Sequence, residues 1–258
     1  YYCNHKILLK NDYEKIEGLE HIDKIISVTQ ESIGKTPRSN PATYTGVFDE
    51  IRELFAQTKE AKAKKYSSNK FSFNTKEGYC NNCKGEGKIK IEMNFTADIW
   101  IKCSQCEGKR YNENALSVKY KGKTIADILE IDIDEAIEFF EDNKKIYKIL
   151  KTMQNVGLGY LKLGQSALTL SGGEAQRIKL AKELSKNQSN KTLYILDEPT
   201  TGLHFEDTKH LINLLKDIIS KGNSVIVIEH NEEIINCADF VIELGPEGGE
   251  NGGYLITH

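Results

Sequence analysis

Residues 170–204, LSGGEAQRIKLAKELSKNQSNKTLYILDEPTTGLH, contain two patterns of phosphate-handling residues in close succession. The first pattern opens a predicted helix. Ser171 is suited to cap this helix, and Glu174, three residues later, is suited to reach back and complete a capping box. Gly172 and Gly173 leave backbone N–H groups uncovered at the positive end of the helix. This end is therefore a predicted docking point for the γ-phosphate of a nucleotide.

The second pattern is a predicted strand that ends in two acidic residues. The short apolar run 193–196 is typical of a buried parallel strand, and Asp197 and Glu198 follow it at the carboxyl end, where open α/β sheets place their ligands. Two carboxylates at that edge suit Mg²⁺ and an attacking water. Either pattern alone has an ordinary explanation, a helix cap or a solvated turn, but together and in this order they predict an ATP site.

The rest of the C-terminal third alternates between strands and helices. After the strand 192–196 we expect a helix that ends at Gly222 and has one apolar face, made of Leu211, Leu214, Leu215, Ile218 and Ile219. Buried strands are predicted at 225–228 and 240–244, which gives a β-α-β-α-β series and hence a parallel sheet with right-handed crossovers. His230 follows the second strand, so we expect it at the same sheet edge as the acidic pair.

Length and composition fit one large α/β core, either alone or with an insertion. The chain has 258 residues, 39% of them apolar, and no run approaches the eighteen or so apolar residues of a membrane span. Its formal charge of −3 conceals an asymmetry, because residues 59–123 carry fifteen Lys or Arg against seven acids, a charge of +8. This basic segment indicates a nucleic-acid contact, with a solvated face as the alternative.

Four of the six cysteines form two Cys-x-x-Cys pairs with nineteen residues between them: Cys80, Cys83, Cys103 and Cys106. Each pair is predicted to turn back on a tight knuckle so that two thiolates point at one ion, and two knuckles complete a tetrahedron around Zn²⁺. Disulfide bonding is the alternative, although the chain otherwise has the composition of a cytosolic protein. Gly85, Gly87 and Gly108 follow the knuckles, where positive φ is expected, and Cys3 and Cys237 stand apart as small apolar residues.

The N-terminal half supplies further predicted elements. A strand at 25–28 ends near Gln30, a loop with two prolines occupies 36–41, and apolar residues between 48 and 55 recur at helical spacing. Residues 89–101 alternate as strands do. Helices return between 124 and 150, with a predicted core of Ile128, Ile137, Phe140 and Ile146.

The sequence Gly34-Lys35-Thr36 matches the last three positions of the P-loop motif, but the segment is not a P-loop. The motif G-x-x-x-x-G-K-[ST] requires a glycine where Thr29 stands. Pro37 follows directly and disfavours the α region for the residue before it, so that a helix cannot start there. The chain therefore contains no Walker A motif.

These motifs resemble the C-terminal half of the UvrA family of excinuclease proteins, the damage-sensing ATPases of bacterial nucleotide excision repair. The signature LSGGEAQR and the Walker B stretch YILDEP are shared with ABC ATPases in general, whereas the inserted cysteine pairs are specific to this family. The resemblance covers nearly the whole chain. Its segments are SIGKTPRSNPATYTGVFDEIRELFA (32–56), YCNNCKGEG (79–87), CSQCEGKRYN (103–112), VKYKGKTIADIL (118–129), VGLGYLKLGQSALTLSGGEAQRIKLA (156–181), LYILDEPTTGLHFED (193–207) and VIVIEHNEEII (225–235) leading to LGPEGG.

The resemblance implies catalytic roles for four residues. Gln30 would be the Q-loop glutamine that senses Mg²⁺ and the attacking water. Asp197 would hold Mg²⁺, Glu198 would polarise the water, and His230 would steady the γ-phosphate in the transition state. Such chemistry consists mainly of positioning and charge stabilisation.

The resemblance also implies that the chain is incomplete as an ATPase. Ser171, Gly172 and Gly173 would contact the γ-phosphate of ATP bound to another nucleotide-binding domain. The family places Walker A a short distance upstream of Tyr1, and the chain starts without an initiator Met, so we expect a fragment that is inactive alone. Lys35 stands where the family is expected to have arginine, which leaves the assignment intact.

The implied fold is α/β: an ABC-type P-loop ATPase core, with a parallel sheet flanked by helices, a helical signature region and an inserted zinc module. We expect four segments. They are 1–58, the N-terminal part of the core with the Q-loop; 59–123, the basic zinc-binding and DNA-contacting insertion; 124–169, the helical signature subdomain; and 170–258, the signature, Walker B and C-terminal part of the core. Lys109, Arg110 and Lys119 are the candidate DNA contacts.

The partners implied by the resemblance are damaged double-stranded DNA, UvrB and a second copy of the protein joined through the ABC domains. The expected cofactors are ATP, Mg²⁺ and Zn²⁺, and the expected setting is the cytoplasm and the SOS response, without a membrane. Three alternatives stay open: a UvrA-like paralogue, a soluble ABC ATPase of drug resistance or translation, and a zinc-bearing interaction module without catalysis.

Overall fold

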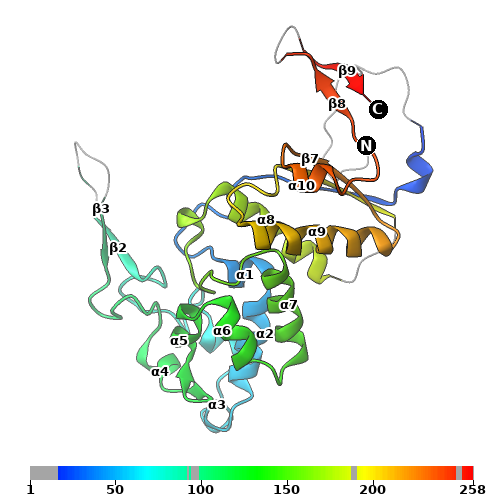
Figure 1. Ribbon diagram of the computed structural model, residues 1–258. Coiled ribbons are helices and arrows are strands. Elements are labelled where there is room, and N and C mark those ends of the chain that lie inside the picture. Colours follow the sequence, from blue (N-terminus) through cyan, green and yellow to red (C-terminus); the bar gives the residue numbers. More distant parts are fainter. Residues whose placement is uncertain (1–16, 92, 94–98, 187–190, 248–251, 258) are drawn as a thin grey trace. The chain divides into compact units, whose positions relative to one another are not determined.

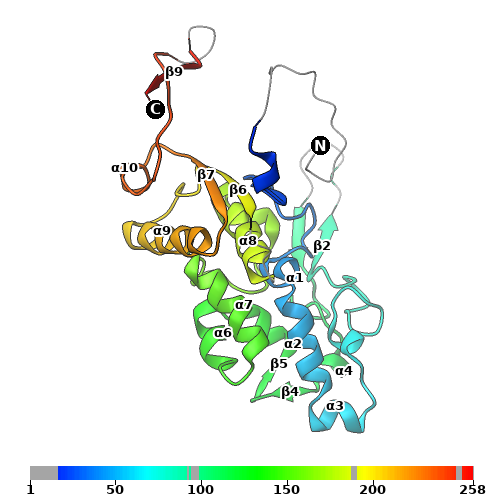
Figure 2. The same ribbon diagram turned by 90° about the vertical axis from the view of Figure 1, so that its right-hand side faces the viewer.

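The computed structural model describes residues 17–91, 93, 99–186, 191–247 and 252–257. The chain groups into two compact units, which we describe separately (Figures 1 and 2). The sheet unit contains the described residues of 1–29 and 189–258, and the helical unit contains those of 30–188. The first segment expected from the sequence, 1–58, is thus divided between the two units.

The sheet unit contains a three-stranded parallel sheet in the order β1-β6-β7. Its strands are Lys24–Val28, Thr192–Asp197 and Ser224–Ile228, respectively. In the register of the sheet, Leu196 lies between Val28 on one side and Val227 on the other. Tyr194 and Leu196 of the central strand are buried. The strands predicted in these three places are confirmed, and a 3₁₀ turn at Leu19–His21 precedes the first of them.

Helix α9 (Phe205–Ser220) forms the crossover from β6 to β7. Three residues of the predicted apolar face are buried: Leu211, Leu215 and Ile218. Ile219, predicted on the same face, is 40% exposed. Gly222 follows the helix with a φ of 83°, a conformation that glycine adopts without strain, so the predicted glycine stop is confirmed.

The prediction of a buried strand at 225–228 is correct for the strand and wrong for its burial. Ile226 and Ile228 are 50% and 57% exposed. Alternate side chains of a strand point to opposite faces, and α9 packs against one face of β7. Ile226 and Ile228 share the other face, which the described part of the chain leaves uncovered.

The third strand predicted in this series, 240–244, does not join the parallel sheet. Residues 240–242 lie outside any strand, and β8 (Glu243–Gly245) pairs antiparallel with β9 (Tyr254–Thr257) in a separate sheet. A parallel partner requires a crossover of a dozen or more residues, usually helical, but the helix after β7, α10 (Glu232–Ile235), has four residues. Pairing with 254–257 needs a shorter connection, and the local hairpin forms instead.

The helical unit is built around an aromatic and aliphatic core. Its helices are α1 (Pro41–Thr45), α2 (Val47–Ala56), α3 (Lys59–Ala63), α4 (Glu113–Leu116), α5 (Ile125–Glu130), α6 (Ile133–Phe139), α7 (Lys144–Asn155) and α8 (Gly172–Ser185), with 3₁₀ turns at Ser68–Phe71 and Ala167–Thr169. The four predicted core residues, Ile128, Ile137, Phe140 and Ile146, are all buried. Phe48 and Phe55 of α2 contact Phe73 and Phe71, each pair with 5.5 Å between ring centroids, which ties this helix to the segment before the cysteines.

Helix α8 packs against α7 and α1. The start of α1 corrects the predicted loop by one residue, because Pro41 is already the first helical residue. Asn40 caps this helix, and Pro fits the first helical position, where its missing N–H costs nothing. None of the helices in the described ranges is both long enough and apolar enough to cross a membrane.

The cysteine module lies between α3 and α4. Within it, β2 (Lys88–Ile91) and β3 (Ile99–Lys102) form an antiparallel ribbon, as the alternation in 89–101 predicted. In Figure 1 this ribbon extends away from the helices of its own unit. A second, shorter ribbon of β4 (Lys119–Tyr120) and β5 (Lys123–Thr124) leads into α5.

Candidate functional site

The carboxyl end of β6 carries the predicted acidic pair. Asp197 is the last residue of the strand, Glu198 follows in a turn, and both are exposed. The N–H of Glu198 donates to the carbonyl of Ile228 at 2.8 Å, so β7 fixes the backbone here. Glu198 has a φ of 44°, a strained left-handed conformation of the kind found at functional sites. The edge thus presents two accessible carboxylates on a fixed backbone, and such oxygen ligands suit Mg²⁺.

Glu229, the residue after β7, has a buried side chain that is 2% exposed. One carboxylate oxygen accepts hydrogen bonds from the N–H and the hydroxyl of Thr200, and the other accepts from the N–H groups of His230 and Asn231. Burial acts to raise the pKa of this carboxyl, but the four donors outweigh it and the pKa of Glu229 is lowered. Glu229 was missed from the sequence, where its only signal is an acidic residue directly before the candidate histidine.

His230 lies at the same edge as Glu198. Its Nδ1 is 4.0 Å from Oε1 of Glu198 and 3.9 Å from Oε2 of Glu229, and its side chain is 82% exposed. The sheet unit therefore brings the predicted water-activating carboxylate and the predicted phosphate-contacting imidazole together. Both groups are open to a ligand.

The start of α8 in the helical unit forms the predicted capping box. The Ser171 hydroxyl accepts from the N–H of Glu174 at 3.2 Å, and the Glu174 carboxylate accepts from the N–H of Ser171 at 2.7 Å. Gln30 lies against this helix end, because a Cβ added to Gly172 would be 3.1 Å from its Oε1. Gly173 is buried. Gln30 and the signature glycines are thus brought together within one unit.

Tyr160 adds a further contact to the capping box, and it was not predicted from the sequence. Its hydroxyl donates to the second carboxylate oxygen of Glu174 at 2.7 Å. Burial and the hydrogen bond to Glu174 raise the pKa of Tyr160. The buried Arg177, one turn along α8, also interacts with this phenol. Glu174 is therefore held from two sides, and no local spacing rule indicates a partner fourteen residues away.

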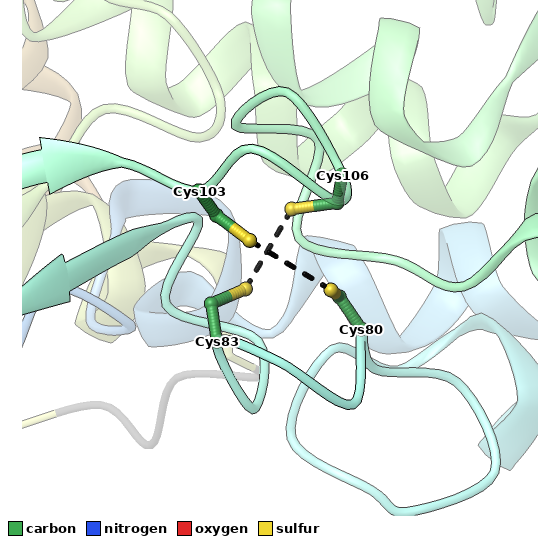
Figure 3. Close-up of side chains that lie close together, drawn as sticks. All are labelled: Cys80, Cys83, Cys103 and Cys106. Atoms are coloured by element: carbon green, nitrogen blue, oxygen red, sulfur yellow. Dashed lines mark hydrogen bonds between the residues drawn. The ribbon is translucent and has the colours of Figure 1, made fainter.

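The sulfur atoms of the four predicted metal ligands converge on one point (Figure 3). All four lie within 4.8 Å of one another, with 3.9 Å between Cys80 and Cys103 and 3.6 Å between Cys83 and Cys106. Thiolates bound at about 2.3 Å to one tetrahedral Zn²⁺ would be about 3.8 Å apart. The four residues carry no disulfide, whose S–S length would be about 2.05 Å. The cluster therefore has the dimensions of a Zn²⁺ site.

Hydrogen-bond donors surround these sulfurs in the way that thiolates require. The N–H of Gly87 donates to Cys83 at 3.3 Å, and the side-chain amide of Asn82 donates to Cys103 at 3.4 Å. Burial opposes ionisation, but hydrogen bonds from the backbone and from the side chains of Cys106 and Asn82 lower the pKa of Cys103 to about 6. For Cys106, burial dominates and raises the pKa to about 12.

The two knuckles have the same backbone shape. Lys84 and Gly85 after the first pair have positive φ, as do Glu107 and Gly108 after the second, and Gly87 shares this property. The positive φ predicted for the three glycines is confirmed. Of the two cysteines outside the cluster, Cys237 is exposed and Cys3 lies outside the described residues.

The three candidate DNA contacts differ in accessibility. Lys109 and Lys119 are exposed, but Arg110 is half-buried. Its Nη2 donates to the carbonyl of Gly164 at 3.2 Å, and its guanidinium lies over the Phe73 ring at 5.4 Å from the centroid. Burial lowers the pKa of Arg110. Arg110 thus joins the second knuckle to the segment that leads to the signature helix.

The β2–β3 ribbon has two chemically different faces. Paired residues of the two strands share a face, and one face carries the basic and aromatic set Lys88, Lys90, Trp100 and Lys102. The other carries Ile89, Ile91, Ile99 and Ile101, of which Ile89 packs against the cysteine cluster. Lysines beside an exposed aromatic ring suit the phosphates and bases of a nucleic acid. Period-two alternation could have revealed these faces from the sequence.

Comparison with known proteins gives consistent matches. Residues 80–201 match the model of the ABC transporter family. The chain is 60% identical over 246 residues, 95% of its length, to UvrABC system protein A of Aquifex aeolicus, and 56% identical over 254 residues to the protein of that name from Methanothermobacter thermautotrophicus. These alignments cover 27% and 26% of the relatives, so the chain spans about a quarter of their length.

Among solved structures, UvrA2 from Deinococcus radiodurans matches with a TM-score of 0.87 and 48% identity, over 93% of this chain and 29% of that one. This likeness confirms the predicted fold class, a parallel sheet flanked by helices in an ABC-type core with an inserted cysteine module. Over nearly its whole length, the chain is therefore similar in sequence and in fold to one part of UvrABC system protein A and of UvrA2, and it covers 26–29% of those proteins.

Proposed function

We propose that the chain takes part in ATP hydrolysis within the damage-recognition component of the bacterial nucleotide excision repair excinuclease. The observation that carries this is the sheet edge, where the exposed Glu198 and His230 face each other at 4.0 Å beside Asp197. Asp197 would hold Mg²⁺, Glu198 would polarise the attacking water, and His230 would steady the γ-phosphate. Mg²⁺, when bound, neutralises charge that develops on the phosphates.

The second half of the ATP chemistry falls to the start of α8. Ser171, Gly172 and Gly173 would contact the γ-phosphate of ATP held by another nucleotide-binding domain, and Gln30 would sense Mg²⁺ and the water. The capping box and the contact between Gln30 and Gly172 support this, because they fix the backbone N–H groups that an anion needs. ATP then joins two copies of the protein through their ABC domains.

Residues 1–258 alone are proposed to hydrolyse ATP negligibly, because the sequence contains no Walker A motif to hold the phosphates. The relatives are about four times as long as the aligned region. Activity is therefore to be tested in the longest natural polypeptide that contains these residues, called the parent polypeptide below.

The cysteine module is proposed to bind one structural Zn²⁺ and to present basic side chains to DNA. Cys80, Cys83, Cys103 and Cys106 would hold the ion, and four thiolates complete the tetrahedral coordination that is typical of a structural site. Lys109, Arg110 and Lys119 remain the candidate DNA contacts. The basic and aromatic face of the β2–β3 ribbon supports them, since it adds lysines and a ring within the same module.

The proposed partners are damaged double-stranded DNA and UvrB, which the protein loads onto the lesion. The proposed setting is the cytoplasm, in the SOS response, without a membrane. A UvrA-like paralogue is the second candidate, and the structural likeness to UvrA2 favours it. The higher identity to the curated UvrABC system proteins, 56–60% against 48%, supports the first candidate.

One experiment separates these functions. ATP hydrolysis by the parent polypeptide is measured with undamaged duplex DNA, with the same duplex carrying a bulky adduct, and without DNA, and UvrB transfer to the adduct is followed by footprinting. We expect turnover to depend on the lesion and UvrB to be left at it. Lesion-dependent turnover without UvrB transfer would favour the paralogue, and turnover indifferent to DNA would favour an ABC ATPase of drug resistance or translation.

A further inference from the structure

The carboxylate of Glu229 has no role in the ATP chemistry described so far, yet its hydrogen-bonding capacity is fully used at that edge. Its two oxygens accept four hydrogen bonds, and an ionised carboxylate offers about four acceptor sites. Thr200 comes from the turn after β6, whereas His230 and Asn231 come from the segment after β7. The carboxylate therefore joins the two segments that carry Glu198 and His230.

The partners of Glu229 require an ionised carboxylate. All four are donors, so an acceptor-only group satisfies every one of them, whereas the amide of a glutamine would turn an NH₂ group toward two of them. Keeping a charge away from water is costly unless its hydrogen bonds are complete. A buried acid saturated by donors is thus a means of fixing geometry.

The geometry that it fixes is that of the reacting groups. The Glu198 carboxylate has Nδ1 of His230 at 4.0 Å from one oxygen and the Thr201 hydroxyl at 3.4 Å from the other. We infer that Glu229 is a positioning residue for ATP hydrolysis, which locks the turn 198–201 to His230 and so sets the separation between the water-activating carboxylate and the imidazole. This inference rests on the ATPase activity proposed above and adds a residue to it.

Steady-state ATP hydrolysis by the parent polypeptide tests this role. Glu229→Gln keeps the size of the side chain but removes acceptor capacity at one oxygen. We expect kcat to fall about 10- to 100-fold and the KM for ATP to stay within about twofold, because a displacement of about 1 Å near a reacting group costs up to a hundredfold in rate. Glu232→Gln is the matched control, since it removes the same charge from an exposed acid in α10 and should leave kcat unchanged.

Thr200→Val provides an independent variant that removes one donor and leaves the carboxylate in place. We expect a smaller fall in kcat, about 3- to 10-fold, and no further loss when it is combined with Glu229→Gln, because both changes break the same connection. Circular dichroism at the assay temperature establishes that each variant is folded.

The outcomes separate this inference from the proposed function. Turnover of Glu229→Gln equal to that of Glu232→Gln, or multiplicative losses in the double variant, would overturn the positioning role and leave the ATPase assignment standing. Should Glu229→Gln not fold, an unchanged kcat in Thr200→Val would overturn it as well. A parent polypeptide that hydrolyses no ATP, or whose hydrolysis is unaffected by Glu198→Gln, would contradict the proposed function and remove the inference with it.

Discussion

The cysteine cluster and the sheet edge both gather ionisable side chains, but they are built in opposite ways. The four cysteines are 0–7% exposed, and their sulfur atoms face one another. At the sheet edge, Asp197, Glu198 and His230 are exposed, and of these four residues only Glu229 has a buried side chain. A closed cluster finds its partners within itself and serves structure, whereas an open edge keeps its groups available to a ligand.

The two sites also differ in which residues adopt a left-handed backbone conformation. In the knuckles, six residues after the cysteine pairs have positive φ, and glycines occupy three of these positions, so half of them are free of strain. At the edge, Glu198 itself has the left-handed backbone, and a buried carboxylate holds its neighbours. The strain therefore lies on the residue proposed to act on water.

The largest expected effect is the loss of metal from the closed cluster. Cys103→Ser removes the sulfur of the most buried of the four cysteines, and we expect zinc to fall from one ion per chain to near zero. Structural Zn²⁺ contributes about 10–16 kcal/mol to the folding of small zinc modules, so the β2–β3 ribbon should become sensitive to protease. Elemental analysis after purification without chelator measures this, and Cys237→Ser, outside the cluster, is the control. If Cys103→Ser retained its zinc, the conclusion that the four cysteines form one closed metal site would be wrong.

Glu198→Gln tests the catalytic role proposed for the open sheet edge. In the parent polypeptide we expect kcat for ATP to fall about a hundredfold or more while nucleotide binding persists, because the group that polarises the water is lost and the phosphate contacts stay. Turnover and equilibrium binding of ATP are measured together. Glu206→Gln, an exposed acid in the first turn of α9, should behave as the unmodified protein. A comparable loss in both variants would show that general charge, rather than the edge, is responsible.

Arg110 and Lys109 are adjacent but should affect stability differently. Arg110→Ala removes the hydrogen bond to Gly164 and the packing on Phe73, so we expect a loss of about 1–3 kcal/mol in the free energy of unfolding. Lys109→Ala, at an exposed position, should stay within about 0.5 kcal/mol. Urea unfolding of the parent polypeptide provides both values. Equal effects would mean that Arg110 is as solvated as its neighbour.

The two exposed lysines test the DNA contact. Lys109→Ala combined with Lys119→Ala should flatten the plot of log affinity against log salt by about 1.8, at about 0.9 per phosphate contact, without altering zinc content. Lys144→Ala combined with Lys148→Ala removes the same charge from exposed positions of α7. The slope of this control should not change. Equal slopes in both double variants would mean that the module presents only a solvated face.

The smallest expected effect is a dependence on pH at the edge. The pKa of Glu229 lies below its ordinary value of 4.5, so its ionised form contributes stability that is present above about pH 4.5 and lost as the pH falls through the lowered value. The difference in Tm between the unmodified protein and Glu229→Gln should therefore be constant near neutral pH and shrink in acid. Glu232→Gln should show no such trend. A difference that persists unchanged in acid would contradict the lowered pKa.

Patterns that act over a few residues could be predicted from the sequence. The box of Ser171 and Glu174, the cysteine knuckles and the three parallel strands all follow from short spacings. Partners that tertiary structure selects could not. Tyr160 reaches Glu174 from a preceding loop, and Thr200 reaches Glu229 across twenty-nine residues.

The wrong strand prediction at 240–244 has the same origin, and so does the unpredicted burial of Arg110. Residues 240–244 have the composition of a buried strand, but the available partner of 243–245 is a nearby antiparallel segment. Arg110 counts as a cation in a basic run, and only the structure shows that it is half-buried against Phe73 and Gly164. Composition gives the charge of a side chain but not its neighbours.

The two-faced ribbon limits how this part of the sequence can change in length. Side chains alternate with a period of two, so one residue inserted within β2 or β3 would exchange that strand's lysine or tryptophan positions with its isoleucine positions. Ile89 would then leave the cysteine cluster and a lysine would take its place. Insertions and deletions inside these strands should therefore survive in evolution only in even numbers.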